Sequence, residues 1–156
     1  MTRRRIGWGL FTLALVLVGL SVYAQAQRPY RPGSVWSIAF IKMKPGMESA
    51  YLTYVASDWK REQEALKSAG AILSYRVISS EAHGSTDWNV MLMTEYKDLA
   101  TYEASDRKAE DVAQKMFGGD EKIRQGYKDR LEIREVLGER LAREIVLEPR
   151  ATAGTQ

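Results

Sequence analysis

The chain has 156 residues, with 23 basic and 20 acidic side chains, one histidine, no cysteine and a formal net charge of +3. The absence of cysteine excludes disulfides and every cysteine-based metal or nucleophile site. The excess charge comes from the three arginines at positions 3–5, and the chain after residue 26 has 20 charges of each sign. Such a neutral domain gives no electrostatic reason to expect nucleic acid or an anionic membrane surface as a partner.

The first 26 residues have the pattern of a secretory signal peptide. A basic start, MTRRR, is followed by an apolar run over 6–22 and by small residues at Ala24 and Ala26. We expect cleavage before Gln27, with cleavage after Ala24 as the second choice. The mature protein is then periplasmic or secreted, without stable membrane insertion. An uncleaved anchor is the alternative, although the run is shorter than the ~20 residues of a spanning helix. The paired arginines also leave the twin-arginine route open.

The mature chain divides into a tether, one domain and a tail. Residues 27–34, QRPYRPGS, hold two prolines and a glycine and predict an irregular tether. Residues 35–148 predict a single domain, and residues 149–156 a disordered tail. The domain begins with a strand over 35–43 that is apolar on both faces, which indicates that the sheet needs a cover on each side.

A Lys-Pro-Gly turn at 44–46 precedes a helix predicted over 47–69. Its apolar residues recur every three or four positions, and its charged residues, Glu62 among them, are expected to face water. Strands are predicted over 72–80 and 88–96, joined as a hairpin. In the second of these, alternation places Trp88, Val90 and Leu92 on one face, and Asn89, Met91, Met93 and Glu95 on the other.

Asp98 can cap a second helix, which we expect to run to about Phe117. After two glycines, Asp120 begins a short further helix with Ile123, Tyr127 and Leu131 on its apolar stripe. Residues 131–148 fit either a helix by propensity or a strand by alternation. We place a strand at about 139–148, because the order β-α-β-β-α needs one more strand to close the sheet. The predicted class is therefore α+β, ferredoxin-like, with helices on one face of an antiparallel sheet.

Four segments carry a resemblance to a known group: VWSIAFIKMKPGMESAYLTY, AGAILSYRVIS, WNVMLMTEY and RLAREIVLEP. In their order and hydrophobicity they resemble the dimeric α+β barrel superfamily, which includes the antibiotic-biosynthesis-monooxygenase-like domains. The resemblance implies a homodimer that packs sheet against sheet, and a ligand pocket between sheet and helices. Because members include cofactor-free oxygenases, haem-binding enzymes and isomerases, the resemblance does not select an activity.

Five residues are candidates for contact with a ligand. Trp59 and Tyr75 can contribute aromatic walls to a pocket for a small apolar or aromatic molecule, although rings of this kind also fill cores and interfaces. Arg76, Asn89 and Glu95 are polar residues within strands that can orient a ligand, or equally form the solvent side of an alternating pattern. No metal site and no cofactor are expected. Haem bound through His83 is the one alternative, and a solvated loop histidine is the simpler interpretation.

The sequence favours an exported, homodimeric ligand-binding or interaction domain, since it contains no recognisable catalytic set. The alternative is a cofactor-independent monooxygenase-like enzyme that acts on a small aromatic or polyketide-like substrate. An enclosed pocket would favour ligand chemistry, whereas aromatic residues that only fill the core would speak against an enzyme.

Overall fold

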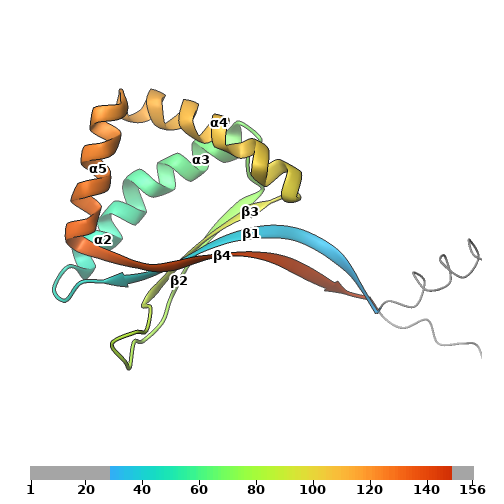
Figure 1. Ribbon diagram of the computed structural model, residues 1–156, viewed down its shortest axis with the longest axis horizontal. Helices are drawn as coiled ribbons and strands as arrows, with labels where there is room; N and C mark the ends of the chain where they lie inside the picture. The colour runs from blue at the N-terminus through green and yellow to red at the C-terminus, as the bar shows by residue number, and fades with distance from the viewer. Residues whose placement is uncertain (1–28, 149–156) are drawn as a thin grey trace, which may run out of the picture. The chain divides into compact units, whose positions relative to one another are not determined.

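The structure is a computed structural model that describes residues 29–148 (Figure 1). The predicted signal peptide, residues 27 and 28 of the predicted tether, and the predicted tail at 149–156 lie outside the described residues. The chain has two compact units, of which one is Gly33–Glu144 and the other includes the described residues 29–32 and 145–148. In the described part of the chain, no helix combines the length and apolarity needed to cross a membrane.

The elements follow the order predicted for a ferredoxin-like domain. They are β1 (Tyr30–Met43), α2 (Glu48–Tyr54), the π-helical η1 (Val55–Trp59), α3 (Lys60–Ser68), β2 (Ser74–Ser79), β3 (Val90–Tyr96), α4 (Leu99–Phe117), α5 (Asp120–Ile133) and β4 (Arg134–Leu147). The segments α2, η1 and α3 form one continuous helix, so the fold is β-α-β-β-α-β with α5 added before the last strand.

The four strands form one antiparallel sheet in the order β2-β3-β1-β4. Strand β1 pairs with β3 from Val35, opposite Tyr96, to Ile41, opposite Val90. At its other edge, the amide of Lys44 donates to the carbonyl of Ile133, and Ser34 donates to Glu144, so β4 runs antiparallel to β1. This strand order and connectivity define the ferredoxin-like α+β fold, which confirms the predicted fold class.

The helices cover one face of the sheet, and the core lies between them (Figure 1). Ile41 of β1 and Val90 of β3 are fully buried on this side, and Tyr51 of α2 meets them from the helical layer. Burying a side chain of this kind contributes about 1.5–3 kcal/mol. The alternation within β1 therefore sends its odd-numbered residues, Val35 and Ile41 among them, into the core, an assignment that the sequence left open.

One wider turn keeps the first helical segment in register with the sheet. Four side chains, at steps of four residues, are buried along it: Tyr51, Val55, Trp59 and Gln63. Because an α-helix has 3.6 residues per turn, three such steps would rotate the buried stripe by about 120°. In η1 the amide of Lys60 bonds to the carbonyl of Val55, a π-type bond that absorbs one extra residue. The buried stripe therefore continues to face the sheet.

Two strands begin earlier than predicted. Strand β1 starts at Tyr30, so the second half of the predicted tether is regular strand. The early start of β1 is explained by its pairing with the end of the chain. The amide of Glu148, directly after β4, donates a hydrogen bond to the carbonyl of Pro29, directly before β1. Pro32 is tolerated because β3 pairs with β1 only from Val35 onward, so no β3 hydrogen bond is lost. Strand β4 starts directly after α5, at Arg134 rather than at about 139.

Two predicted orientations are wrong. Trp88 precedes β3 rather than belonging to it, and its ring packs edge-on against Phe40, with ring centres 5.8 Å apart, on the face away from the helices. In α5, Tyr127 and Leu131 are exposed. The helix instead turns a stripe of Ile123, Gly126, Arg130 and Ile133 inward, at steps of three, four and three. The inward stripe was missed because only two of its four residues are apolar.

The second face of the sheet has no helix over it in the described part of the chain (Figure 1). By alternation from the core residues, it carries large apolar side chains at its centre, namely Trp36, Ile38, Phe40, Met91 and Met93. These side chains are half-buried by one another rather than by a covering layer. The centre of this face is therefore an apolar patch.

Candidate functional site

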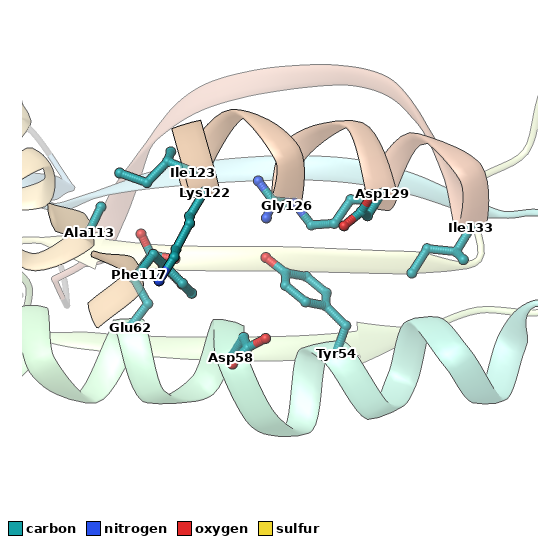
Figure 2. Close-up of a pocket in the computed structure, with 11 residues that line it drawn as sticks. Tyr54, Asp58, Glu62, Ala113, Phe117, Lys122, Ile123, Gly126, Asp129 and Ile133 are labelled. Carbon is teal, nitrogen blue, oxygen red and sulfur yellow. The ribbon is translucent and has the colours of Figure 1, made fainter. Parts of the chain in front are cut away.

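The candidate site is a cavity of about 390 Å³ in the helical layer, where α5 faces the α2–η1–α3 helix (Figure 2). Helix α5 packs against α2 and against α4. The apolar part of the cavity wall consists of Ala113, Phe117, Ile123 and Ile133, and its polar part of Tyr54, Asp58, Glu62, Lys122, Asp129 and Arg130. A volume in this range suits a small organic ligand.

Tyr54 stands at the centre of the helix wall, with its hydroxyl directed toward α5 (Figure 2). The guanidinium carbon of Arg130 lies 5.2 Å from the centre of the Tyr54 ring, a cation–π distance. Burial raises the pKa of the Tyr54 hydroxyl, while the positive charge of Arg130 opposes that rise. Tyr54 is therefore a neutral phenol at physiological pH, able to donate and accept a hydrogen bond.

Arg130 reaches into the same space from α5. Its guanidinium carbon also lies 5.5 Å from the ring centre of Tyr127, so the guanidinium is within cation–π distance of two rings. Its Nε is buried and has no hydrogen-bond partner among the described residues. A buried donor without a partner is costly, but this Nε is fully buried and is not part of the cavity surface.

Glu62 places a carboxyl group, a hydrogen-bond acceptor, in the same cavity wall as the Arg130 guanidinium. It follows Tyr54 by two turns of the helix, and its side chain is half-buried in the cavity wall. Burial raises the pKa of its carboxyl, the nearby Arg130 lowers it, and Asp58 raises it further. Its carboxylate forms no hydrogen bond or ion pair within residues 29–148. The expectation that Glu62 faces water is wrong, because α5 covers this side of the helix.

The remaining charged groups of the site already have partners or face solvent. Asp58 forms an ion pair of 2.9 Å with Arg61, and Asp129 accepts a hydrogen bond of 2.7 Å from Gln125. Lys122 is exposed at the rim. The inner polar set is therefore Tyr54, Glu62 and Arg130, and we call these three residues the polar triplet.

Gly126 keeps the cavity open. It lies within α5, where a glycine costs about 1 kcal/mol relative to alanine, and it lines the cavity opposite Tyr54 (Figure 2). A Cβ added at this position would meet only Nη1 of Arg130, at 3.5 Å, which is ordinary contact. An alanine fits at this position, whereas a longer side chain would enter the space.

The π-helical segment η1 lies directly beside the site, since Tyr54 precedes it and Asp58 belongs to it. Single π turns are found frequently at functional sites. In this protein the extra residue allows one helix to keep its core stripe on the sheet while it presents Tyr54, Asp58 and Glu62 to α5.

The structure does not bring the five predicted site residues together. Trp59 and Tyr75 lie on the helix side of the sheet and pack edge-on, with ring centres 5.4 Å apart. Trp59 is 8% exposed and belongs to the core. The hydroxyl of Tyr75 donates a hydrogen bond to the carboxylate of Glu64. The two rings therefore contact each other, but neither residue lines the cavity.

The three polar candidates, Arg76, Asn89 and Glu95, contact residues of the sheet rather than the cavity. Arg76 lies on the uncovered face, with its guanidinium carbon 5.4 Å from the Trp36 ring centre. Glu95, on the same face, accepts a hydrogen bond from Ser74. Asn89 ends the strand pairing, where its Oδ1 accepts a hydrogen bond of 2.8 Å from the amide of Met43.

His83 lies in the exposed loop between β2 and β3. Its amide donates to the carboxylate of Asp87, and the neighbouring amide of Gly84 does the same, at 3.0 and 2.8 Å. The hydrogen bonds shape the loop through backbone amides. Among residues 29–148, no group of three or more histidine, aspartate or glutamate side chains is placed to hold a metal ion.

No protein-family model and no curated protein matches the sequence. Two solved structures are similar to it. One is the crystal structure of HapK from Hahella chejuensis, with 12% identity, a TM-score of 0.48, and coverage of 77% of this chain and 99% of that one. The other is a dimeric protein of unknown function and ferredoxin-like fold from Bacteroides fragilis NCTC 9343, with 16% identity, a TM-score of 0.40, and coverage of 74% and 97%. The chain is a ferredoxin-like α+β protein by its own strand order.

Proposed function

We propose that this protein is an exported, homodimeric ligand-binding domain that holds a small organic molecule in the cavity between α5 and the α2–η1–α3 helix, without a cofactor. The observation that carries the proposal is the polar triplet, in which the Tyr54 phenol, the half-buried Glu62 carboxyl and the Arg130 guanidinium line one cavity of about 390 Å³. Groups of this kind are normally paired when a protein only needs a core.

The homodimer is supported by the composition of the uncovered face. Its apolar centre is flanked by charges of opposite sign, with Arg76 on the β2 edge and Glu139 on the β4 edge by alternation from the core residue Val136. A two-fold axis parallel to the strands would place β2 of one copy over β4 of the other. Arg76 would then meet Glu139 of the second copy, so the face is complementary to itself.

Light scattering of the purified mature protein tests the dimer. We expect twice the protomer mass at micromolar concentration, and a monomer for Ile38→Asp, which places a charge at the apolar centre of the face. Leu52→Asp, on an exposed helical position, is the matched control and should remain a dimer. A folded monomer for the unmodified chain would contradict the assembly.

Thermal-shift screening of small aromatic compounds tests the ligand site with two variants at one position. Gly126→Ala leaves the cavity open, whereas Gly126→Leu fills it. Compounds that raise the Tm of the unmodified protein and of Gly126→Ala should leave that of Gly126→Leu unchanged. Equal shifts in all three proteins would place binding elsewhere and refute the proposed site.

Export is the part of the proposal that rests on the sequence alone. Residues 1–26 have the three-part pattern of a signal peptide. Cell fractionation followed by N-terminal sequencing should find the protein outside the cytoplasm, beginning at Gln27. A full-length chain retained in the membrane fraction would support the uncleaved anchor instead.

A cofactor-independent, monooxygenase-like enzyme of the dimeric α+β barrel superfamily is the second candidate. It is favoured by Tyr54 and Glu62, which place a phenol and a carboxyl of raised pKa in one partly apolar cavity. Such groups can move a proton to or from a bound substrate. Once a bound aromatic compound is known, its consumption by the unmodified protein and its persistence with Glu62→Gln would distinguish the enzyme from a binding domain.

A further inference from the structure

We infer that a two-stranded ribbon, formed by residues 30–32 of β1 and 145–147 of β4, packs its apolar face onto the second copy of the chain in the homodimer. We call these residues the ribbon, and they belong to the smaller of the two compact units. The inference rests on the proposed homodimer and adds to it a contact made by residues outside the apolar centre of the uncovered sheet face.

The ribbon has two strands and no third. The amide of Glu148 donates a hydrogen bond of 2.9 Å to the carbonyl of Pro29, which fixes the antiparallel register of the two strands. Strand β3 pairs with β1 only from Val35 onward, so in the described part of the chain the ribbon has no third strand beside it. Two paired strands alone are marginally stable in water and need a surface to pack on.

One face of the ribbon is apolar and exposed. In the register of the two strands, residue 30 lies opposite residue 147 and residue 32 opposite residue 145, and alternate residues of a strand share a face. The side chains on this face are therefore Tyr30, Pro32, Ile145 and Leu147. Tyr30 is 40% exposed, Ile145 60% and Leu147 79%. Large apolar side chains gathered on one exposed face indicate a contact surface.

The opposite face of the ribbon is polar. Arg31 alternates with the apolar residues of β1, and its Nε forms an ion pair of 3.0 Å with the carboxylate of Glu148. The two side chains are 62% and 49% exposed, as expected of a pair that faces water. A ribbon with one polar and one apolar face has a defined orientation, in which the apolar face meets the partner.

The second copy of the chain is the partner that the sequence favours. Residues 149–156, PRATAGTQ, follow the ribbon but contain no apolar side chain larger than proline. The apolar run over 6–22 belongs to the predicted signal peptide and is absent from the exported protein that we propose. The ribbon strands continue along the chain into the parts of β1 and β4 that carry Ile38 and Glu139 of the proposed dimer face. A two-fold dimer makes each contact twice, so it would cover both ribbons.

Photo-crosslinking within mixed-isotope dimers of the mature protein tests this contact. The photoreactive residue p-benzoylphenylalanine is introduced at position 147, and unlabelled and ¹⁵N-labelled protein are refolded together in equal amounts. Peptides joined between two copies then include pairs of mixed isotope composition, whereas peptides joined within one copy do not. We expect mixed pairs from position 147. The same residue at position 67, exposed on α3, is the control and should give none.

Charge substitutions on the ribbon give a second measurement. Ile145→Asp and Leu147→Asp each place a charge on the apolar face and should raise the Kd of the dimer about tenfold or more, because the loss occurs twice per dimer. Arg31→Gln, on the polar face, is the matched control and should change the Kd by about threefold or less. Sedimentation velocity over a dilution series measures the Kd, and dispersed NMR spectra confirm that each variant is folded.

Crosslinks from position 147 that join only peptides of the same copy, residues 149–156 included, would overturn the ribbon contact while the homodimer stands. The absence of any crosslink from this position would overturn it as well, and so would equal Kd values for Ile145→Asp and Arg31→Gln. Failure of the homodimer itself is a different result, in which light scattering finds the unmodified mature protein to be a folded monomer.

Discussion

The guanidinium of Arg130 rests over the ring of Tyr54 at 5.2 Å, with its Nε buried and without a partner in the described part of the chain. The two residues come from different helices, α5 and α2, and both line the cavity. Their contact places a guanidinium and a phenol together in the wall of a partly apolar space. It gives a physical reason to regard the cavity as a binding site rather than as a packing defect.

Glu62→Gln should make the ligand-free protein more stable at pH 7. Burial raises the pKa of the Glu62 carboxyl, so folding favours its protonated form. The stability it contributes is complete below the unfolded pKa of about 4.3 and is lost as the pH rises through the higher folded pKa. The advantage of Glu62→Gln should therefore be present at pH 7 and disappear below pH 4. Urea unfolding at both pH values measures it.

Glu110→Gln, on an exposed position of α4, is the control for this experiment and should change little at either pH. Loss of stability in Glu62→Gln at pH 7 would mean that Glu62 makes a strong ion pair in solution. That result would remove the free acceptor on which the polar triplet depends.

Gly126→Ala should raise the free energy of unfolding by about 0.5–1 kcal/mol, because alanine loses less conformational freedom in a helix and its Cβ has room. Chemical denaturation measures this change. Gly46→Ala is the contrasting variant: its φ of 78° disfavours any side chain, so it should lose stability. A destabilised Gly126→Ala would show that the cavity is closed at this point.

Ile41→Ala should cost about 2–5 kcal/mol, since it removes a fully buried side chain from the centre of the core. Leu52→Ala, at a position 45% exposed on α2, should change stability by about 0.5 kcal/mol or less. Equilibrium unfolding of both variants distinguishes the core from the surface of the same layer. Equal losses would contradict the assignment of the buried face.

Asp98→Ala should lower the Tm at neutral pH. The Asp98 carboxylate caps α4 by accepting from the amide of Thr101 at 2.7 Å, and this bond lowers the pKa of Asp98. The contribution is present above the unfolded pKa of about 3.9 and is lost as the pH falls through the folded pKa. The difference in Tm should therefore vanish in strong acid. Asp98→Asn should keep most of the cap, and equal loss in both variants would contradict this role.

The sequence predicted the layers of the fold because each strong local signal agreed with the topology. Alternation in β1 separated Val35 and Ile41 from Trp36, and Asp98 marked the start of α4. The last strand was found only because the sheet needed it, since its composition fits a helix equally well. Its early start at Arg134 follows from pairing with β1, which no local pattern encodes.

The cavity escaped prediction for a physical reason. The inward stripe of α5 includes Gly126 and Arg130, so a search for apolar periodicity selected Tyr127 and Leu131, which are exposed. Glu62 was predicted to be a surface residue, because no pattern in the sequence shows that α5 covers this side of the helix. One usable signal was present: a glycine and an arginine at the inward spacing of an otherwise regular helix. The four-residue spacing from Tyr51 to Gln63 could likewise have predicted the π turn beside Tyr54.

Native mass spectrometry of the purified mature protein tests the central claim most directly, because it reports the assembly and a retained small molecule together. We predict a dimer that carries a small organic compound when unmodified or as Gly126→Ala, and a dimer without it as Gly126→Leu. A compound retained equally by Gly126→Leu, or a bare monomer in all three cases, would contradict a homodimer that binds its ligand beside Arg130 and Tyr54.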